Sequence, residues 1–262
     1  MHRPAGAGVV ERAGGMLALA LRVGAALATP PFAWRREAAI FLAAVLRRTL
    51  PAIALSIALW GFAGPGLQAG NFLVLFGAPD RAGGFMVVAI LREFGTFVTA
   101  TVVAGVAGTM LTSELGARRV RGELDALSVL AVDPVAALVA PRVVALVLAL
   151  VGLDLIALVA GVAGGYVADV GVLGSTTGAF LASFFANTTF VDLVASVLKV
   201  AIFGALIGLI CAWHGLNATG GPEGVGRAVN RAVVGCLIAI FAVNLVFIQG
   251  LLAAFPDLGV LR

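Results

Sequence analysis

Five long apolar segments constrain this chain more than any other feature of its sequence. A helix needs about 20 mostly apolar residues to cross the hydrocarbon layer of a membrane, and five stretches offer roughly that length: 50–66, 84–111, 143–167, 194–213 and 232–254. Only 11% of the 262 residues are charged, whereas soluble domains carry about 25%. The apolar excess must therefore face lipid. We predict an all-α integral membrane protein with five transmembrane helices.

Residues 8–48 precede the first span and combine short apolar stretches with scattered arginines. The arginines interrupt each apolar stretch before it is long enough to cross a membrane. We predict one or two helices that lie in the membrane interface, and hence an interfacial segment over 1–48 followed by a transmembrane domain over 49–262. The same charges argue against a cleavable signal peptide.

The arginines also predict the orientation of the spans, because positively charged connections stay in the cytoplasm. Of the two connections on the opposite side, one holds only Arg81 and the other holds no basic residue. We therefore expect a cytoplasmic N-terminus and, after five crossings, an external C-terminus. Cys211 and Cys236 then lie near cytoplasmic helix ends, where reduced thiols are expected. The cytoplasmic basic residues are Arg3, Arg12, Arg22, Arg35, Arg36, Arg47, Arg48, Arg118, Arg119, Arg121, Arg142, Arg227 and Arg231.

The connection between the second and third spans has the pattern of an amphipathic helix over 113–133, ended by Pro134. Charged residues occupy one face, and the apolar face consists of Val120, Leu124, Leu127 and Ala131. Taken alone, this pattern favours a helix that lies on the membrane with its basic face on lipid phosphates.

Four ionisable residues fall within the predicted spans: Arg92, Glu93, Asp154 and Lys199. Charges inside a membrane are costly and mark a functional site or an internal pair. We predict an ion pair between Glu93 and Lys199, because at 1.5 Å per residue they lie about 13 Å and about 8 Å below the outer boundary. Asp154 is the alternative partner for Lys199, and Arg92 is the alternative partner for Glu93. A structural clamp and a transport path both remain open.

Several chemical functions find no support in the sequence. The only lysine, Lys199, is followed by Val200, so the chain has no Walker A motif. The glycine-rich segment 217–227 follows no strand, and a tight turn before the fifth span explains it better than a phosphate site. The only histidines are His2 and His214, which leaves no zinc protease motif. A single aspartate well inside a span argues against aspartyl proteolysis.

Eight short motifs in order resemble the MlaE/YrbE family of ABC transporter permeases, most closely its actinobacterial YrbE members. The resemblance covers roughly residues 35–250. The motifs are LREFG (91–95), AG (104–105), ELG (114–116), ELDAL (123–127), VDP (132–134), PR (141–142), KVAIFG (199–204) and GGPEGVGRA (220–228).

The resemblance implies a five-helix permease of the bacterial cytoplasmic membrane with an N-terminal interfacial helix. It implies a dimer, a separate ABC ATPase that binds the ATP, MCE-domain proteins as partners and a lipid as substrate, with no cofactor on this chain and no nucleic acid. It also implies that the helix between spans two and three docks on the ATPase. We assign this contact to Glu114, Arg118, Arg119, Arg121, Glu123 and Asp125.

Two departures from the family pattern, Thr96 and Val106, leave open whether the second permease is an identical copy or a paralogue. A non-transporting membrane scaffold is an alternative function, and an ion channel or secondary transporter is another. The sequence specifies neither the lipid nor the direction of transport.

Overall fold

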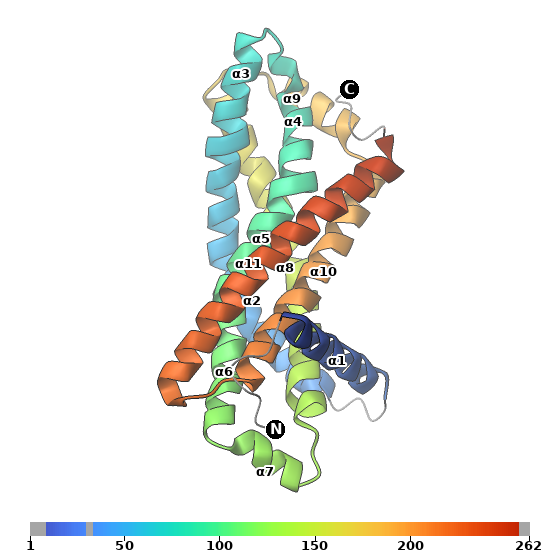
Figure 1. The fold of residues 1–262 in the computed structure, drawn as a ribbon. Coiled ribbons are helices and arrows are strands. Elements are labelled where there is room, and N and C mark those ends of the chain that lie inside the picture. The colour runs from blue at the N-terminus through green and yellow to red at the C-terminus, as the bar shows by residue number, and fades with distance from the viewer. Residues whose placement is uncertain (1–8, 30–33, 257–262) are drawn as a thin grey trace. The chain divides into compact units, whose positions relative to one another are not determined.

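The computed structural model describes residues 9–29 and 34–256, and every regular element within these ranges is a helix (Figure 1). The predicted all-α class is therefore confirmed. Arg3 and both chain ends lie outside the described residues. The elements are α1 (Val9–Ala28), α2 (Trp34–Gly61), η1 (Phe62–Ala69), α3 (Gly70–Leu75), η2 (Pro79–Arg81), α4 (Ala82–Met86), η3 (Val87–Phe94), α5 (Gly95–Val103), η4 (Ala104–Gly108), α6 (Thr109–Val120), α7 (Glu123–Val129), η5 (Val135–Val139), α8 (Ala140–Gly171), α9 (Thr177–Asn187), α10 (Phe190–Leu216) and α11 (Gly221–Ala254).

Five helical stretches are long and apolar enough to cross a membrane, and each contains one of the predicted spans. The stretches are longer than the predicted segments at both ends or at one, because a helix continues after its composition turns polar. Their bounds are Trp34–Leu75, Pro79–Val120, Val135–Gly171, Phe190–Leu216 and Gly221–Ala254.

The N-terminal part of the chain differs from its prediction in one respect. A separate helix, α1, is present, but α2 begins at Trp34 and runs without a break past residue 48 into the first span. The predicted boundary between an interfacial segment and the membrane domain therefore falls inside a helix. Exposed arginines along α2 lower the mean hydropathy of its first half, so the sequence did not predict one continuous helix there. The buried residues of this half nevertheless recur at helical spacing: Ala38, Phe41, Val45 and Thr49.

The predicted helix over 113–133 is wrong as a single element. The second span continues as α6 to Val120, and α7 is a separate helix of seven residues. Gly122 separates them with a φ of 76°, a left-handed conformation that glycine adopts without steric cost and that commonly ends a helix. Of the predicted apolar face, Leu124 is buried whereas Val120 and Ala131 are exposed.

The chain divides into two compact units, and each of the five stretches that could cross a membrane contributes to both. Unit 1 consists of the described residues of Met1–Val45, Ala104–Leu146 and Gly204–Leu237, and unit 2 consists of those of Leu46–Val103, Val147–Phe203 and Ile238–Arg262.

Unit 2 has an apolar core between its helices and a close backbone contact. Buried Met86, Ile90 and Leu158 pack together with Phe180 of α9. A Cβ atom added at Gly61 of α2 would lie 2.2 Å from the carbonyl oxygen of Gly161 in α8, so only glycine allows this approach. Such contacts replace the hydrophobic driving force that helices lack in lipid.

Unit 1 packs α6 against α10 and α10 against α11. The hydroxyl of Thr112 donates to the carbonyl oxygen of Cys211 at 3.2 Å. Cys211 and Cys236 are buried free thiols whose sulfur atoms lie 3.6 Å apart. The predicted turn is present but shorter than the glycine-rich segment: it covers residues 217–220, and α11 begins at Gly221, with positive φ at Gly220 and Gly221 at the junction.

Candidate functional site

Arg92 and Asp192 form a buried ion pair in unit 2. Nε of Arg92 donates to Oδ1 of Asp192 at 2.7 Å, and Nη2 donates to Oδ2 at 3.3 Å and to the carbonyl oxygen of Asn187 at 3.2 Å. The side chains are 6% and 0% exposed. Neither charge reaches water, so each depends on the other for its stabilisation.

The first turn of α10 holds Asp192 in place. Its Oδ2 accepts from the backbone N–H and the hydroxyl of Thr189, each at 2.9 Å, and its own N–H donates to Thr189 Oγ1 at 3.4 Å. This reciprocal arrangement is a capping box. Asp192 belongs to the first turn of α10 and is 1% exposed.

Lys199 does not form the predicted direct ion pair with Glu93. Its amino group donates to the carbonyl oxygen of Arg92 at 2.6 Å and to Asn244 Oδ1 at 3.1 Å. Asn244 Nδ2 in turn donates to Glu93 Oε2 at 3.2 Å. Lys199 and Glu93 are therefore linked through an amide that lies on α11, and the two acceptors already satisfy most of the lysine's hydrogen-bonding capacity.

A groove of about 570 Å³ adjoins this chain of polar contacts within unit 2. Its walls are mostly apolar, while Glu93 and Asn244 supply polar groups at one place. The groove thus combines a charged end with an apolar wall. Its lining residues are Glu93, Phe241, Ala242, Asn244, Leu245, Ile248 and Gln249.

Asp154, the fourth predicted intramembrane charge, lies on α8 and is completely buried. Its Oδ2 atom is 2.5 Å from the hydroxyl of Ser196 on α10. Lys199, one turn further along α10, is close enough to interact with it electrostatically. The structure thus brings all four predicted residues into unit 2 and adds Asp192, Ser196 and Asn244.

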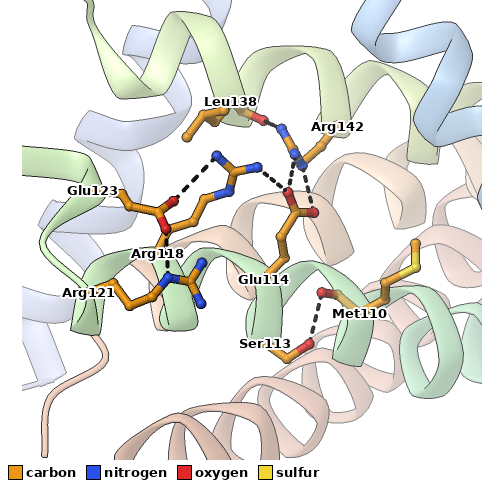
Figure 2. A network of polar contacts seen from close by, with 8 residues as sticks. All are labelled: Met110, Ser113, Glu114, Arg118, Arg121, Glu123, Leu138 and Arg142. Carbon is orange, nitrogen blue, oxygen red and sulfur yellow. Dashed lines mark hydrogen bonds and ion pairs between the residues drawn. The ribbon is translucent and has the colours of Figure 1, made fainter. Parts of the chain in front are cut away.

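Unit 1 contains a second network of charges, centred on Glu114 of α6 (Figure 2). Arg142 donates to Glu114 through Nη2 at 2.5 Å and through Nε at 3.3 Å, and its Nη1 donates to the carbonyl oxygen of Leu138 at 2.7 Å. Arg118 also donates to Glu114, at 3.1 Å. Arg142 is 8% exposed and Glu114 is 31% exposed at the side chain, so this network is half-solvated. It fixes the start of α8 to α6.

The network continues to α7 through more exposed pairs. Arg118 lies 3.7 Å from Glu123, and Nε of Arg121 donates to Glu123 at 2.6 Å. The hydrogen bond from Arg121, assisted by the charge of Arg118, lowers the pKa of the Glu123 carboxyl below its usual value. Arg119 and Asp125 form a separate contact at 2.7 Å. Beyond these charges, Val129 at the end of α7 is 87% exposed.

Comparison with known proteins identifies the family. Residues 41–249 match the family described as Permease MlaE, which is most of the chain. The chain belongs to the MlaE permease family. It is therefore a multi-pass transporter permease, and the sequence-based assignment to this family is confirmed. The closer likeness to actinobacterial members stays a prediction.

Relatives of this MlaE-family permease occur in bacteria and in a plant. It is 38% identical over 179 residues to a probable ABC transporter permease of Synechocystis sp., covering 68% of each chain. It is 29% identical over 182 residues to the intermembrane phospholipid transport system permease protein MlaE of Haemophilus influenzae, covering 69% of this chain and 70% of that one. With TRIGALACTOSYLDIACYLGLYCEROL 1, chloroplastic, of Arabidopsis thaliana, it shares 36% identity over 173 residues, which is about half of the plant protein.

Three site residues of this MlaE-family permease were missed in the sequence, and two of them left a signal. Thr189 and Asp192 have the spacing of a capping box, which marks the start of a helix. Asn244 is a polar residue in the middle of an apolar span. Ser196 gave no signal in the sequence, since serine is common in transmembrane helices. Within residues 9–29 and 34–256, no group of three or more His, Cys, Asp or Glu side chains could hold a metal.

Proposed function

We propose that this permease moves lipid across or between envelope membranes and that its substrate path includes the groove beside Glu93 and Asn244. The groove is the observation that supports this proposal, because an amphiphile needs an apolar wall for its acyl chains and polar groups for its head. Charged residues inside membranes mark substrate pathways. The name of the Haemophilus relative, which refers to intermembrane phospholipid transport, supports the same substrate class.

The groove can be tested with two neighbouring positions on α11. Leu245 lines the groove and is 62% exposed, whereas Val246 is 72% exposed and is not part of the lining. We expect Leu245→Trp to fill the groove and to reduce the lipid that co-purifies per permease molecule, measured by mass spectrometry from native membranes. Val246→Trp is the matched control and should retain the parental amount. Equal lipid in both variants would exclude the groove and favour a scaffold without a lipid path.

We further propose that a separate ABC ATPase binds ATP and docks on the segment 113–133. The absence of a Walker A motif from the sequence is consistent with a nucleotide site on another protein. Two features suit a docking surface: exposed charges at Glu123 and Asp125 of α7, and exposed apolar side chains at Val129 and Leu130, where the helix ends. MCE-domain proteins and a second permease copy or paralogue complete the proposed assembly.

Reversal of the two acidic residues of α7 tests the docking surface. Glu123→Arg with Asp125→Arg should weaken ATPase co-purification, while the permease stays in the membrane. Glu223→Arg is a suitable control, because Glu223 is 91% exposed on α11, outside the segment. ATPase recovery that is equal for the α7 variant and the control would leave α7 as a membrane-surface element.

We also propose a cytoplasmic-membrane location with the N-terminus inside and the C-terminus outside, from the arginine distribution. Both native cysteines are buried, so an impermeant thiol reagent reports only on introduced ones. Gly178 on α9 has open space around it and Val129 on α7 is exposed. In intact cells, Gly178→Cys should be labelled and Val129→Cys should not. The reverse pattern would invert the topology.

A further inference from the structure

Asp154 is a buried charge-bearing group in unit 2 with few polar partners. Its side chain has no exposed surface. Oδ2 contacts the hydroxyl of Ser196, and Oδ1 has no hydrogen-bond partner within the ranges that the structure describes. A buried carboxylate is normally stabilised by a cation or by several donors. Asp154 has one hydroxyl.

The neighbouring charges already have partners. Arg92 is paired with Asp192 through two hydrogen bonds. Lys199 donates to the Arg92 carbonyl and to Asn244, which links it to Glu93. With every group ionised, two cations would face three carboxylates, of which Asp154 and Asp192 are buried and Glu93 is half-buried beside the groove. A proton on Asp154 removes this excess negative charge.

We propose that Asp154 is a proton-binding site within the membrane-spanning part of this permease. The carboxyl group binds a proton while Lys199 is held by the Arg92 carbonyl and Asn244. It releases the proton when the lysine ammonium turns toward Asp154, because a cation at contact favours the charged form. The bound proton lies on a carboxyl oxygen, where the O–H group can donate to Ser196 Oγ. The proton comes from solvent and returns to it, and no other bond changes.

Occupancy of this site sets the net charge of the buried cluster and is linked to the position of Lys199. Arg92, Glu93 and Asp192 are the remaining ionisable groups of the cluster. Proton binding at Asp154 does not depend on the identity of the transported substrate. It assigns to α8 a ligand, the proton, that the lipid-transport proposal does not require.

Infrared spectroscopy of the permease in lipid nanodiscs tests this inference directly. Ordinary carboxyl groups are ionised between about pH 5 and about pH 8, so a carboxylic acid C=O band within this window reports a perturbed group. We expect such a band to grow as the pH is lowered, and to be missing in Asp154→Asn. Ser196→Ala should shift the frequency of the band without removing it, since the acid loses its hydrogen-bond partner. Lys199→Met should move its titration to higher pH.

A stability comparison separates the proton site from a structural ion pair. At the acidic end of the window, Asp154→Asn should keep the parental Tm, because an amide resembles the neutral acid. The matched variant Asp192→Asn should show a marked fall in Tm, because it removes a charged partner of Arg92. If no band depends on Asp154 at any pH in the window, Asp154 is a permanent anion and the inference is overturned. If Asp154→Asn does not fold, the band shift in Ser196→Ala decides, and its absence overturns the inference equally.

Discussion

Arg92 in unit 2 and Arg142 in unit 1 each pair with one carboxylate through two hydrogen bonds, but their surroundings differ. Asp192, the partner of Arg92, is 0% exposed, whereas Glu114, the partner of Arg142, is 31% exposed. Water can therefore compensate Glu114 when its partner is lost but cannot reach Asp192. An ion pair of the same kind should therefore be strictly required in unit 2 and tolerant of change in unit 1, which suits a fixed intramembrane site and the proposed docking surface.

Removing one partner of the buried pair should produce the largest effect. Asp192→Asn leaves the Arg92 charge uncompensated and should destabilise the permease by about 3–5 kcal/mol. The measurement is unfolding monitored in detergent micelles. The double variant Arg92→Leu with Asp192→Leu should recover much of the loss, because no lone charge remains. A single variant as stable as the parent would show that water reaches the pair, which removes the contrast between the units.

Breaking the link through Asn244 should have the next largest effect. Asn244→Leu leaves Lys199 with one acceptor and Glu93 without its amide donor, at a cost of about 1–3 kcal/mol by the same unfolding measurement. Gln249→Leu is the control, since Gln249 lines the same groove but takes part in none of these hydrogen bonds. Equal losses in both variants would assign the effect to the groove rather than to the link.

The geometry around Lys199 also predicts the result of a charge exchange. In the double variant Glu93→Lys with Lys199→Glu, a carboxylate at position 199 would face the Arg92 carbonyl oxygen, which now accepts from the lysine. We expect the exchange to restore no stability relative to the single variants, because two acceptors repel each other. Restoration would show that Glu93 and Lys199 interact directly after all.

The half-solvated network of unit 1 should respond more weakly. Arg142→Lys keeps the charge but loses the planar set of donors that contacts Glu114 and the Leu138 carbonyl, at a cost of about 1–2 kcal/mol. Arg119→Lys, at the exposed contact with Asp125, should change stability by less than about 0.5 kcal/mol. If the two substitutions cost the same, burial does not govern the strength of this network.

The smallest effect should come from Glu123 and should depend on pH. Its pKa is lowered in the folded protein, so its stabilising contribution is present above the ordinary value of 4.5 and is lost as the pH falls through the folded value. Glu123→Gln should therefore have a slightly lower Tm than the parent at neutral pH and the same Tm at the acidic end of the titration. A difference that is independent of pH would show that the carboxylate charge does not matter.

The membrane architecture was predictable because apolar composition along the chain needs no knowledge of tertiary contacts. All five spans follow from it, whereas their ends do not: α2 and α6 continue into arginine-containing segments. The identity of the intramembrane charges was also readable, since such residues are rare in lipid. Which of these charges pair with which partners could not be predicted from the sequence. Arg92 and Asp192 lie 100 residues apart, and which side chains meet depends on how each helix is rotated about its axis.

The π-helical segment η3, Val87–Phe94, has a consequence for how Arg92 is aimed. A π turn is closed by a hydrogen bond to the fifth residue rather than the fourth, so it contains one residue more than an α turn. Loss of one residue here would leave an unbroken α-helix, because the wider turn absorbs the extra residue, but the side chains within the turn would point in different directions. The guanidinium would then leave Asp192. A length difference of one residue at this position would therefore redirect the Arg92 charge without the substitution of any side chain.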